Sequence, residues 1–229
     1  MALLRAIALG GIVIPLAIAC GDSTATRDQG TGGDGSSPVA PAASAVIEQS
    51  GFGGDENYLW VTSTVRDVPV GQFATVSFNL YGADGTLLAS ESQTEQGVNP
   101  GARITVGTQV AAPAGQAVTR IEPTLKISEH DPVQRPKFSD VVLQVGPTTL
   151  GQNSFGSPTA DAILTNPSDQ QIPSARVGAI CFNPQGTIIG GGYAFPDVIP
   201  ANGEVKVSSE LKTSEPPARC ELTAQPSDF

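Results

Sequence analysis

The stretch that decides the fold is residues 74–88, Ala-Thr-Val-Ser-Phe-Asn-Leu-Tyr-Gly-Ala-Asp-Gly-Thr-Leu-Leu. Val76, Phe78 and Leu80 alternate with polar residues, a period of two that is typical of a strand with one buried face. Asp84 and Gly85 favour the left-handed backbone that a tight hairpin turn needs. The segment therefore predicts two antiparallel strands joined by a turn.

Further short runs along the chain also predict strands, and no window longer than about two turns carries a helical stripe. The runs are residues 58–65, 74–81, 86–90, 103–110, 119–127, 141–145, 160–165, 175–182, 187–190, 204–208 and 219–223. Residues 51–57 are expected to form a loop, and the triple glycine at 190–192 a loop or a bulge. The chain is therefore expected to be all-β.

The two halves of the chain repeat at a shift of about 100 residues. Gly85-Thr86-Leu87-Leu88 corresponds to Gly186-Thr187-Ile188-Ile189. A repeat of this length indicates two copies of a domain, because solenoid repeats are only 20 to 50 residues long. We expect domains at residues 46–128 and 138–229, joined by a charged, proline-containing linker at 129–137. The single histidine, His130, lies in this linker, and no role is expected for it.

The N-terminal residues read as an export signal. Residues 1–19 contain Arg5, an apolar run and small residues at the end, and Cys20 follows. This pattern is typical of a secretory signal, and residues 17–20 resemble the site at which bacterial lipoproteins are cleaved and acylated. The alternative is an ordinary signal peptide with an incidental Cys20. Residues 20–45 are rich in Gly, Ser, Thr and Asp and predict a disordered tether.

The other two cysteines, Cys181 and Cys220, form an even pair once Cys20 carries lipid. In an oxidising compartment such a pair is expected to be bridged, and two buried free thiols are the alternative. At the repeat shift, Cys181 corresponds to Leu80 and Cys220 falls close to Ile121. The disulfide is thus expected where the first copy has an aliphatic pair.

Residues 78–85, Phe-Asn-Leu-Tyr-Gly-Ala-Asp-Gly, resemble the motif of the FxLYD family of extracytoplasmic domains, with Gly82 in place of the family's Asp. In the second half Ala179, Cys181 and Phe182 occupy the motif positions. The resemblance implies two tandem immunoglobulin-like β-sandwiches after a signal peptide and a disordered tether. It also implies a location in a bacterial envelope, and it brings no catalytic residues and no agreed ligand.

Composition narrows the function classes. The formal net charge is −10, which argues against nucleic acid as a partner because affinity there comes largely from neutralising phosphates. A catalytic triad or zinc site usually needs histidine, and the chain has one. Asp55 and Glu56 lie in a glycine-rich loop, where a solvated turn is favoured over a cation site. No catalytic residue, metal or cofactor is predicted.

Aromatic residues are the remaining candidates for recognition. Trp60 points opposite to Leu59 and Val61 on a strand, so it either packs in a core or stands outside as a ligand platform, with core packing favoured. Tyr193 poses the same question. The sequence favours a non-enzymatic lipoprotein, held by lipid on Cys20 at the extracytoplasmic face of the cell membrane, with a structural or interaction role. The alternatives are a carbohydrate- or peptidoglycan-binding module that uses these aromatics and, less favoured, an enzyme with dispersed carboxylates.

Overall fold

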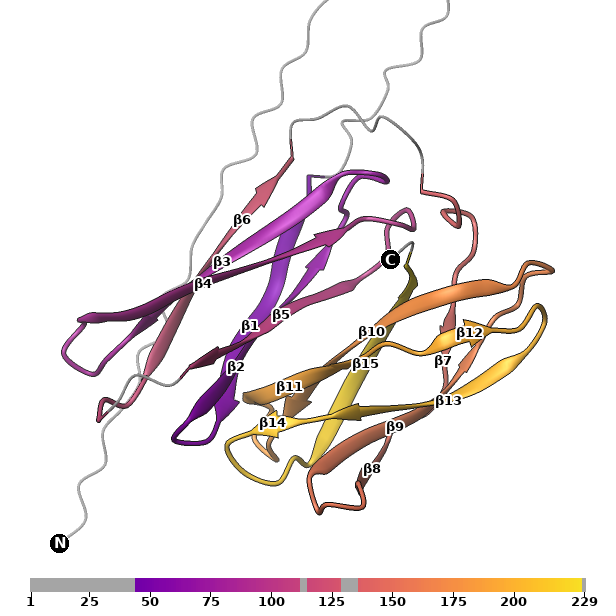
Figure 1. Ribbon diagram of the computed structural model, residues 1–229. Helices are drawn as coiled ribbons and strands as arrows, with labels where there is room; N and C mark the ends of the chain where they lie inside the picture. Colours follow the sequence, from indigo (N-terminus) through magenta and orange to yellow (C-terminus); the bar gives the residue numbers. More distant parts are fainter. Residues whose placement is uncertain (1–43, 112–114, 129–135, 228–229) are drawn as a thin grey trace, which may run out of the picture. The chain divides into compact units, whose positions relative to one another are not determined.

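The computed structural model describes residues 44–111, 115–128 and 136–227, which belong to one compact unit, Ala42–Phe229. The predicted signal peptide, Cys20, the tether up to residue 43 and linker residues 129–135 lie outside the described residues. Within them the chain is all-β, as the sequence predicts, and its antiparallel sheets pair into two β-sandwiches (Figure 1).

The first sandwich contains two three-stranded antiparallel sheets, ordered β1-β2-β5 and β4-β3-β6. Its strands are β1 (Val46–Gly54), β2 (Tyr58–Arg66), β3 (Phe73–Tyr81), β4 (Leu87–Gln96), β5 (Ile104–Ala111) and β6 (Arg120–Ile127). The alternating residues Val76, Phe78 and Leu80 of β3 are all buried between these sheets, together with Val61 of β2 and Val106 of β5. Hydrophobic burial of one face of each sheet thus builds the first core.

The second sandwich repeats this plan with more, shorter strands. Its strands are β7 (Gln144–Val145), β8 (Thr149–Gln152), β9 (Pro158–Thr165), β10 (Ile172–Phe182), β11 (Ile188–Ala194), β12 (Asp197–Ile199), β13 (Glu204–Glu210), β14 (Lys212–Thr213) and β15 (Arg219–Pro226). One sheet has the order β12-β10-β11-β14, with β15 also paired to β10, and the other has the order β13-β9-β7, with β8 paired to β9. Leu164, Val177 and Val207 lie in the core between them.

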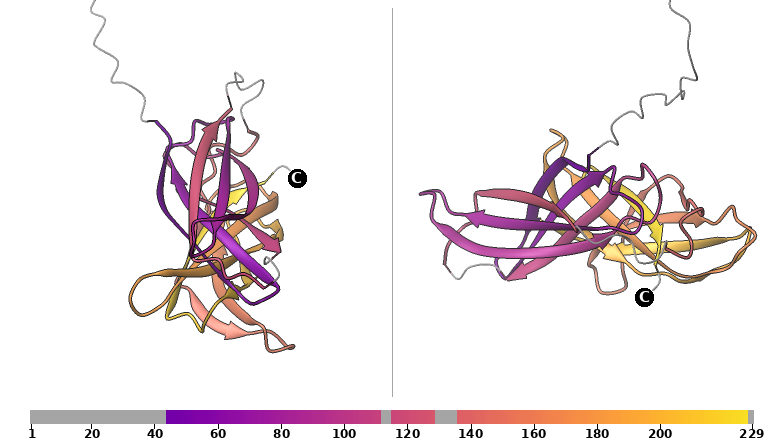
Figure 2. Two further views of the ribbon diagram at one scale, coloured as in Figure 1. Left: turned by 90° about the vertical axis from the view of Figure 1, so that its left-hand side faces the viewer. Right: turned by 90° about the horizontal axis from the view of Figure 1, so that it is seen from above.

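The two sandwiches pack through sheets that are not equivalent in the repeat. Strands β1, β2 and β5 contact β10, β11 and β15, and this contact forms a third layer between the two cores (Figures 1 and 2). Thr62 of β2 and Ile180 of β10 are fully covered although they point away from their own cores. The sheets therefore follow one another in the order β4-β3-β6, β1-β2-β5, β11-β10-β15 and β9-β13.

The internal repeat is visible in strand register. Leu80 of β3 lies opposite Ile121 of β6, and Cys181 of β10 lies opposite Cys220 of β15. Each of the strands β3 and β10 also has a register shift at the next residue. Cys181 and Cys220 are disulfide bonded, which confirms the predicted bridge and its place in the layer that the aliphatic pair fills in the first sandwich.

Two local predictions are wrong, and a third holds for only one of its two alternatives. Residues 51–54 are not a loop, because they form the end of β1 and pair with β2. The triple glycine at 190–192 lies inside β11, and Gly190 stands beside the register shift, so of the two predicted alternatives the bulge fits and the loop does not. Residues 141–143 are not strand, and only Gln144–Val145 pair with β9. In the first two cases the glycines allow another strand of the same chain to approach closely. Hydrophobic periodicity carries no information about such an approach.

Candidate functional site: the interface between the sandwiches

Alternation along β2 decides which side chains face the second sandwich. Val61 and Val65 point into the first core, so Trp60, Thr62 and Thr64 point to the opposite side. All three are buried there, because the sheet of β10, β11 and β15 covers this face. The interface thus places polar and aromatic groups from both sandwiches in one layer.

Trp60 packs edge-on against Tyr193 of β11, with ring centroids 5.3 Å apart and ring planes at 77°. Gly191 permits this contact: a Cβ atom at this position would lie 3.0 Å from Nε1 of Trp60 and 2.1 Å from the carbonyl oxygen of Ala179. Trp60 is only 9% exposed. The candidate ligand platform of Trp60 and Tyr193 is therefore wrong, because these two rings cover each other and not a ligand.

The hydroxyl of Tyr193 joins three segments. It accepts a hydrogen bond from the backbone N–H of Gly107 at 2.8 Å. It lies 3.0 Å from the carbonyl oxygen of Thr105 and 3.2 Å from Oε1 of Glu95, and it can donate its proton to either. Burial, and then the negative charge of Glu95, raise the pKa of Tyr193 far above its usual value. The hydroxyl therefore remains protonated and acts as a fixed connector.

Glu95 and Arg176 form a buried ion pair across the interface. Nη2 of Arg176 lies 2.6 Å from Oε1 of Glu95, and the Glu95 side chain is 5% exposed. The guanidinium of Arg176 stacks over Tyr193 at 3.9 Å and lies 5.2 Å from the ring centroid of Phe195. Burial raises the pKa of Glu95, whereas the positive charge of Arg176 lowers it, and the net shift is upward. Desolvation therefore outweighs the ion pair at this carboxyl.

Polar contacts continue along the interface on either side of this pair. The hydroxyls of Thr105 and Thr223 lie 2.9 Å apart, and the Thr223 hydroxyl accepts a hydrogen bond from the Thr105 N–H. Nε2 of Gln225 donates to the carbonyl oxygen of Gln96 at 3.0 Å. These contacts link the end of β15 to β4 and β5, so that side chains from both sandwiches hold the two sheets in register.

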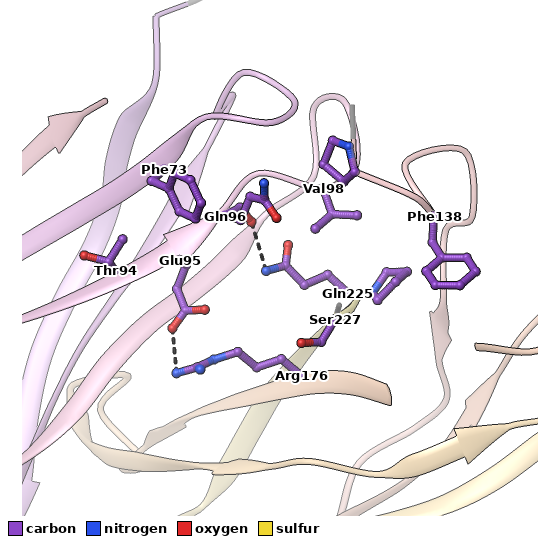
Figure 3. Close-up of a pocket in the computed structure, with 11 residues that line it drawn as sticks. Phe73, Thr94, Glu95, Gln96, Val98, Phe138, Arg176, Gln225 and Ser227 are labelled. Carbon is purple, nitrogen blue, oxygen red and sulfur yellow. Dashed lines mark hydrogen bonds and ion pairs between the residues drawn. The ribbon is translucent and has the colours of Figure 1, made fainter. Parts of the chain in front are cut away.

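A cavity of about 260 Å³ lies at one end of this interface (Figure 3). Thr94, Glu95 and Gln96 come from β4, whereas Arg176 and Gln225 come from the second sandwich. Further lining residues are apolar or small: Phe73, Val98, Pro136, Phe138, Pro226 and Ser227. Of the described residues that line the cavity, Glu95 is the only carboxylate. The cavity thus combines a buried ion pair with aromatic walls.

Asp55, from the glycine-rich loop that the sequence predicts, lies in a turn next to β2. Oδ1 of Asp55 accepts hydrogen bonds from the N–H groups of Asn57 and Tyr58, and its Oδ2 pairs with Lys212 at 3.2 Å. These hydrogen bonds lower the pKa of Asp55, and they indicate a turn-stabilising role. In the described parts of the chain no group of three or more His, Cys, Asp or Glu side chains could hold a metal ion.

The sequence did not single out Glu95 or Arg176. Glu95 lies opposite Ala74 in the β3–β4 register, and it has the same parity on β4 as the half-buried Ala89. Its place on the same face as Ala89 could have indicated that Glu95 is buried. It could not indicate the partner, because Arg176 lies 81 positions away in the sequence. The ion pair becomes visible only when the two sandwiches are packed together.

Comparisons with known proteins add no assignment. No protein-family model matches the chain, and no curated protein matches it. Over the residues that the structure describes, no helix is long and apolar enough to cross a membrane.

Proposed function

We propose that this chain is an exported lipoprotein, held by acyl chains on Cys20 at the extracytoplasmic face of a bacterial cell membrane. Its two sandwiches, which resemble FxLYD-type immunoglobulin-like domains, act as a non-enzymatic structural or interaction unit in the cell envelope. The partner expected for such a unit is an envelope protein or a cell-wall glycan.

The observation that carries this proposal is the use of the cysteines. The chain has three, and the disulfide between Cys181 and Cys220 accounts for two. Disulfides persist in oxidising compartments, which fits export. Cys20 is then the odd cysteine, at the junction between an apolar leader and a polar tether. A diacylated cysteine supplies the two chains that stable anchoring requires.

The contacts between the sandwiches favour the interpretation that the two act as one unit and not as two independent modules. Trp60 and Glu95 are buried in the layer that the two sandwiches share, and their partners Tyr193 and Arg176 are half-buried there. Domains in tandem are expected to move relative to each other unless their interface is large and hydrophobic, and here Trp60 and Ile180 supply buried apolar surface. A tether of about 25 residues would give such a unit a reach of about 25–30 Å from the membrane surface.

Substitution of Cys20 tests the anchor. The full-length protein is expected in the membrane fraction of intact cells, labelled by an alkyne-tagged fatty acid, and Cys20→Ala is expected unlabelled in the medium. Ser23→Ala, a nearby change in the tether, is the matched control and should behave as the wild type does. Retention of Cys20→Ala in the membrane fraction would show that the anchoring proposal is wrong.

A further inference from the structure

We infer that the cavity at the end of the interface is a binding site for a small, uncharged, hydroxyl-rich ligand, of the size of a single sugar residue. This site is distinct from the rejected aromatic platform, and it does not depend on the lipid anchor. It exists only where the two sandwiches meet, since Glu95 comes from the first and Arg176 and Gln225 from the second (Figure 3).

The cavity wall contains buried hydrogen-bonding groups that lack partners. Nε2 of Gln225 donates to Gln96, which fixes the amide so that its Oε1 is an acceptor. Gln225 is 8% exposed, and this oxygen has no hydrogen-bond partner. Nε of Arg176 is likewise buried and unpaired. Leaving such a group unsatisfied costs about 1–3 kcal/mol, so native structures rarely do so without a reason.

Glu95 adds a second free acceptor. The hydrogen bonds from Gln93 and Tyr193 and the ion pair with Arg176 all engage its Oε1. Among the described residues, none hydrogen-bonds to Oε2. The cavity surface therefore offers one free acceptor, on Glu95, and the unpaired Oε1 of Gln225 and Nε of Arg176 lie beneath that surface, where a ligand reaches them only after wall side chains shift. Hydroxyl groups match this set because each one can both donate and accept.

The charge balance favours a neutral ligand. Glu95 and Arg176 are the only charged residues among the described lining residues, and they neutralise each other at 2.6 Å. A ligand carboxylate would approach Glu95, and a ligand ammonium would approach Arg176. In a buried site either like-charge contact is costly. A neutral polyol avoids both.

The volume of the cavity and its apolar walls further restrict the class of ligand. The volume of about 260 Å³ far exceeds the 10–15 Å³ that one water needs, and it falls just below the range for drug-sized ligands. Phe73 and Phe138 supply aromatic surface, and Val98 an aliphatic one. A sugar ring presents hydroxyls at its rim and C–H groups on its face, so it can use both kinds of wall.

Ligand-observed NMR on the full chain tests this site, with methyl β-glucoside and N-acetylglucosamine as neutral probes and benzylamine and benzoate as charged probes. We expect saturable binding of a neutral probe with a Kd of about 1 mM. Phe73→Ala should weaken it about fivefold, because an aromatic contact is worth about 1 kcal/mol. Tyr58→Ala, another part-exposed aromatic of the first sandwich that does not line the cavity, is the matched control.

Glu95→Gln provides a second, independent variant, because it keeps the shape of the side chain but removes one acceptor oxygen. We expect the same probe to bind more weakly, while circular dichroism shows a folded protein. The inference is overturned if neither sugar binds and the cavity holds ordered water only, if a charged probe binds in preference to both sugars, or if Phe73→Ala and Tyr58→Ala bind the sugar equally.

Discussion

Glu95 has an unusual position for a carboxylate, at 5% exposure and opposite the core residue Ala74. Its partners are Arg176, Tyr193 and Gln93, yet burial still raises its pKa. A folded-state pKa above the unfolded value means that the folded protein retains the proton to higher pH than the unfolded chain does. Stability contributed by protonated Glu95 is present below the ordinary value of 4.5, and it decreases as the pH rises through the folded pKa.

Glu95→Gln removes the titratable group. The difference in free energy of unfolding between the wild type and this variant, measured against pH, therefore reports the contribution of Glu95. The free energy of unfolding of the wild type should decrease relative to that of Glu95→Gln as the pH rises from below 4.5 through the raised pKa of Glu95, because only the wild type releases a proton from position 95. Denaturant unfolding at several pH values measures this difference. Parallel pH profiles, or a relative gain by the wild type, would contradict the upward pKa shift.

At the scale of elements, the two copies stabilise one structural position in different ways. The β3–β6 pair has Leu80 opposite Ile121, and the β10–β15 pair has the Cys181–Cys220 bridge in the same place. The bridge closes a loop across a sequence separation of 39 residues. On the chain-entropy model it stabilises the folded chain by about 4 kcal/mol, mainly by restricting the unfolded chain.

Replacement of both cysteines, Cys181→Ala with Cys220→Ala, should therefore lower the free energy of unfolding by about 2–5 kcal/mol. Denaturant unfolding without reductant measures the loss. Addition of dithiothreitol should destabilise the wild type and leave the double variant unchanged. Equal stability of the two proteins without reductant would show that the bridge does not stabilise the folded state.

The same scale shows what sequence periodicity could and could not predict. Strand β3 was predicted to within one residue because its apolar residues alternate strictly. Strand β1 was not predicted at all, and its second half was expected to be a loop because Gly51 and Gly53 carry no apolar signal. Their role is spatial: a Cβ on Gly51 would lie 2.4 Å from Cβ of Ile188 in the second sandwich. Periodicity also gave the direction of Trp60, but it could not show that Tyr193 covers it.

At the scale of the whole described unit, Trp60 connects the stability of the two sandwiches. Trp60→Ala should lower the free energy of unfolding by about 3–5 kcal/mol, because it leaves a large cavity in the layer between them. Tyr58→Ala, at a 45% exposed aromatic with the same parity on β2, should cost far less. Calorimetry of the three proteins checks this. The wild type should unfold in one transition, and equal melting temperatures for the two variants would contradict a stabilising interface.

The order of the four sheets has a consequence for self-association. Contacts between non-equivalent faces can propagate from molecule to molecule without closing, as in a fibre, whereas a contact between identical faces ends at a pair. The two outermost faces of this stack do not offer such a continuation. One carries the Asp161–Lys206 ion pair, and the other carries the Arg120–Glu122 ion pair and, further along β6, Lys126 opposite Thr75. These ion pairs would lose their hydration if a third sandwich stacked on them, and burial of exposed ion pairs costs free energy. We therefore expect stacking to stop at two sandwiches, since further stacking would bury these ion pairs.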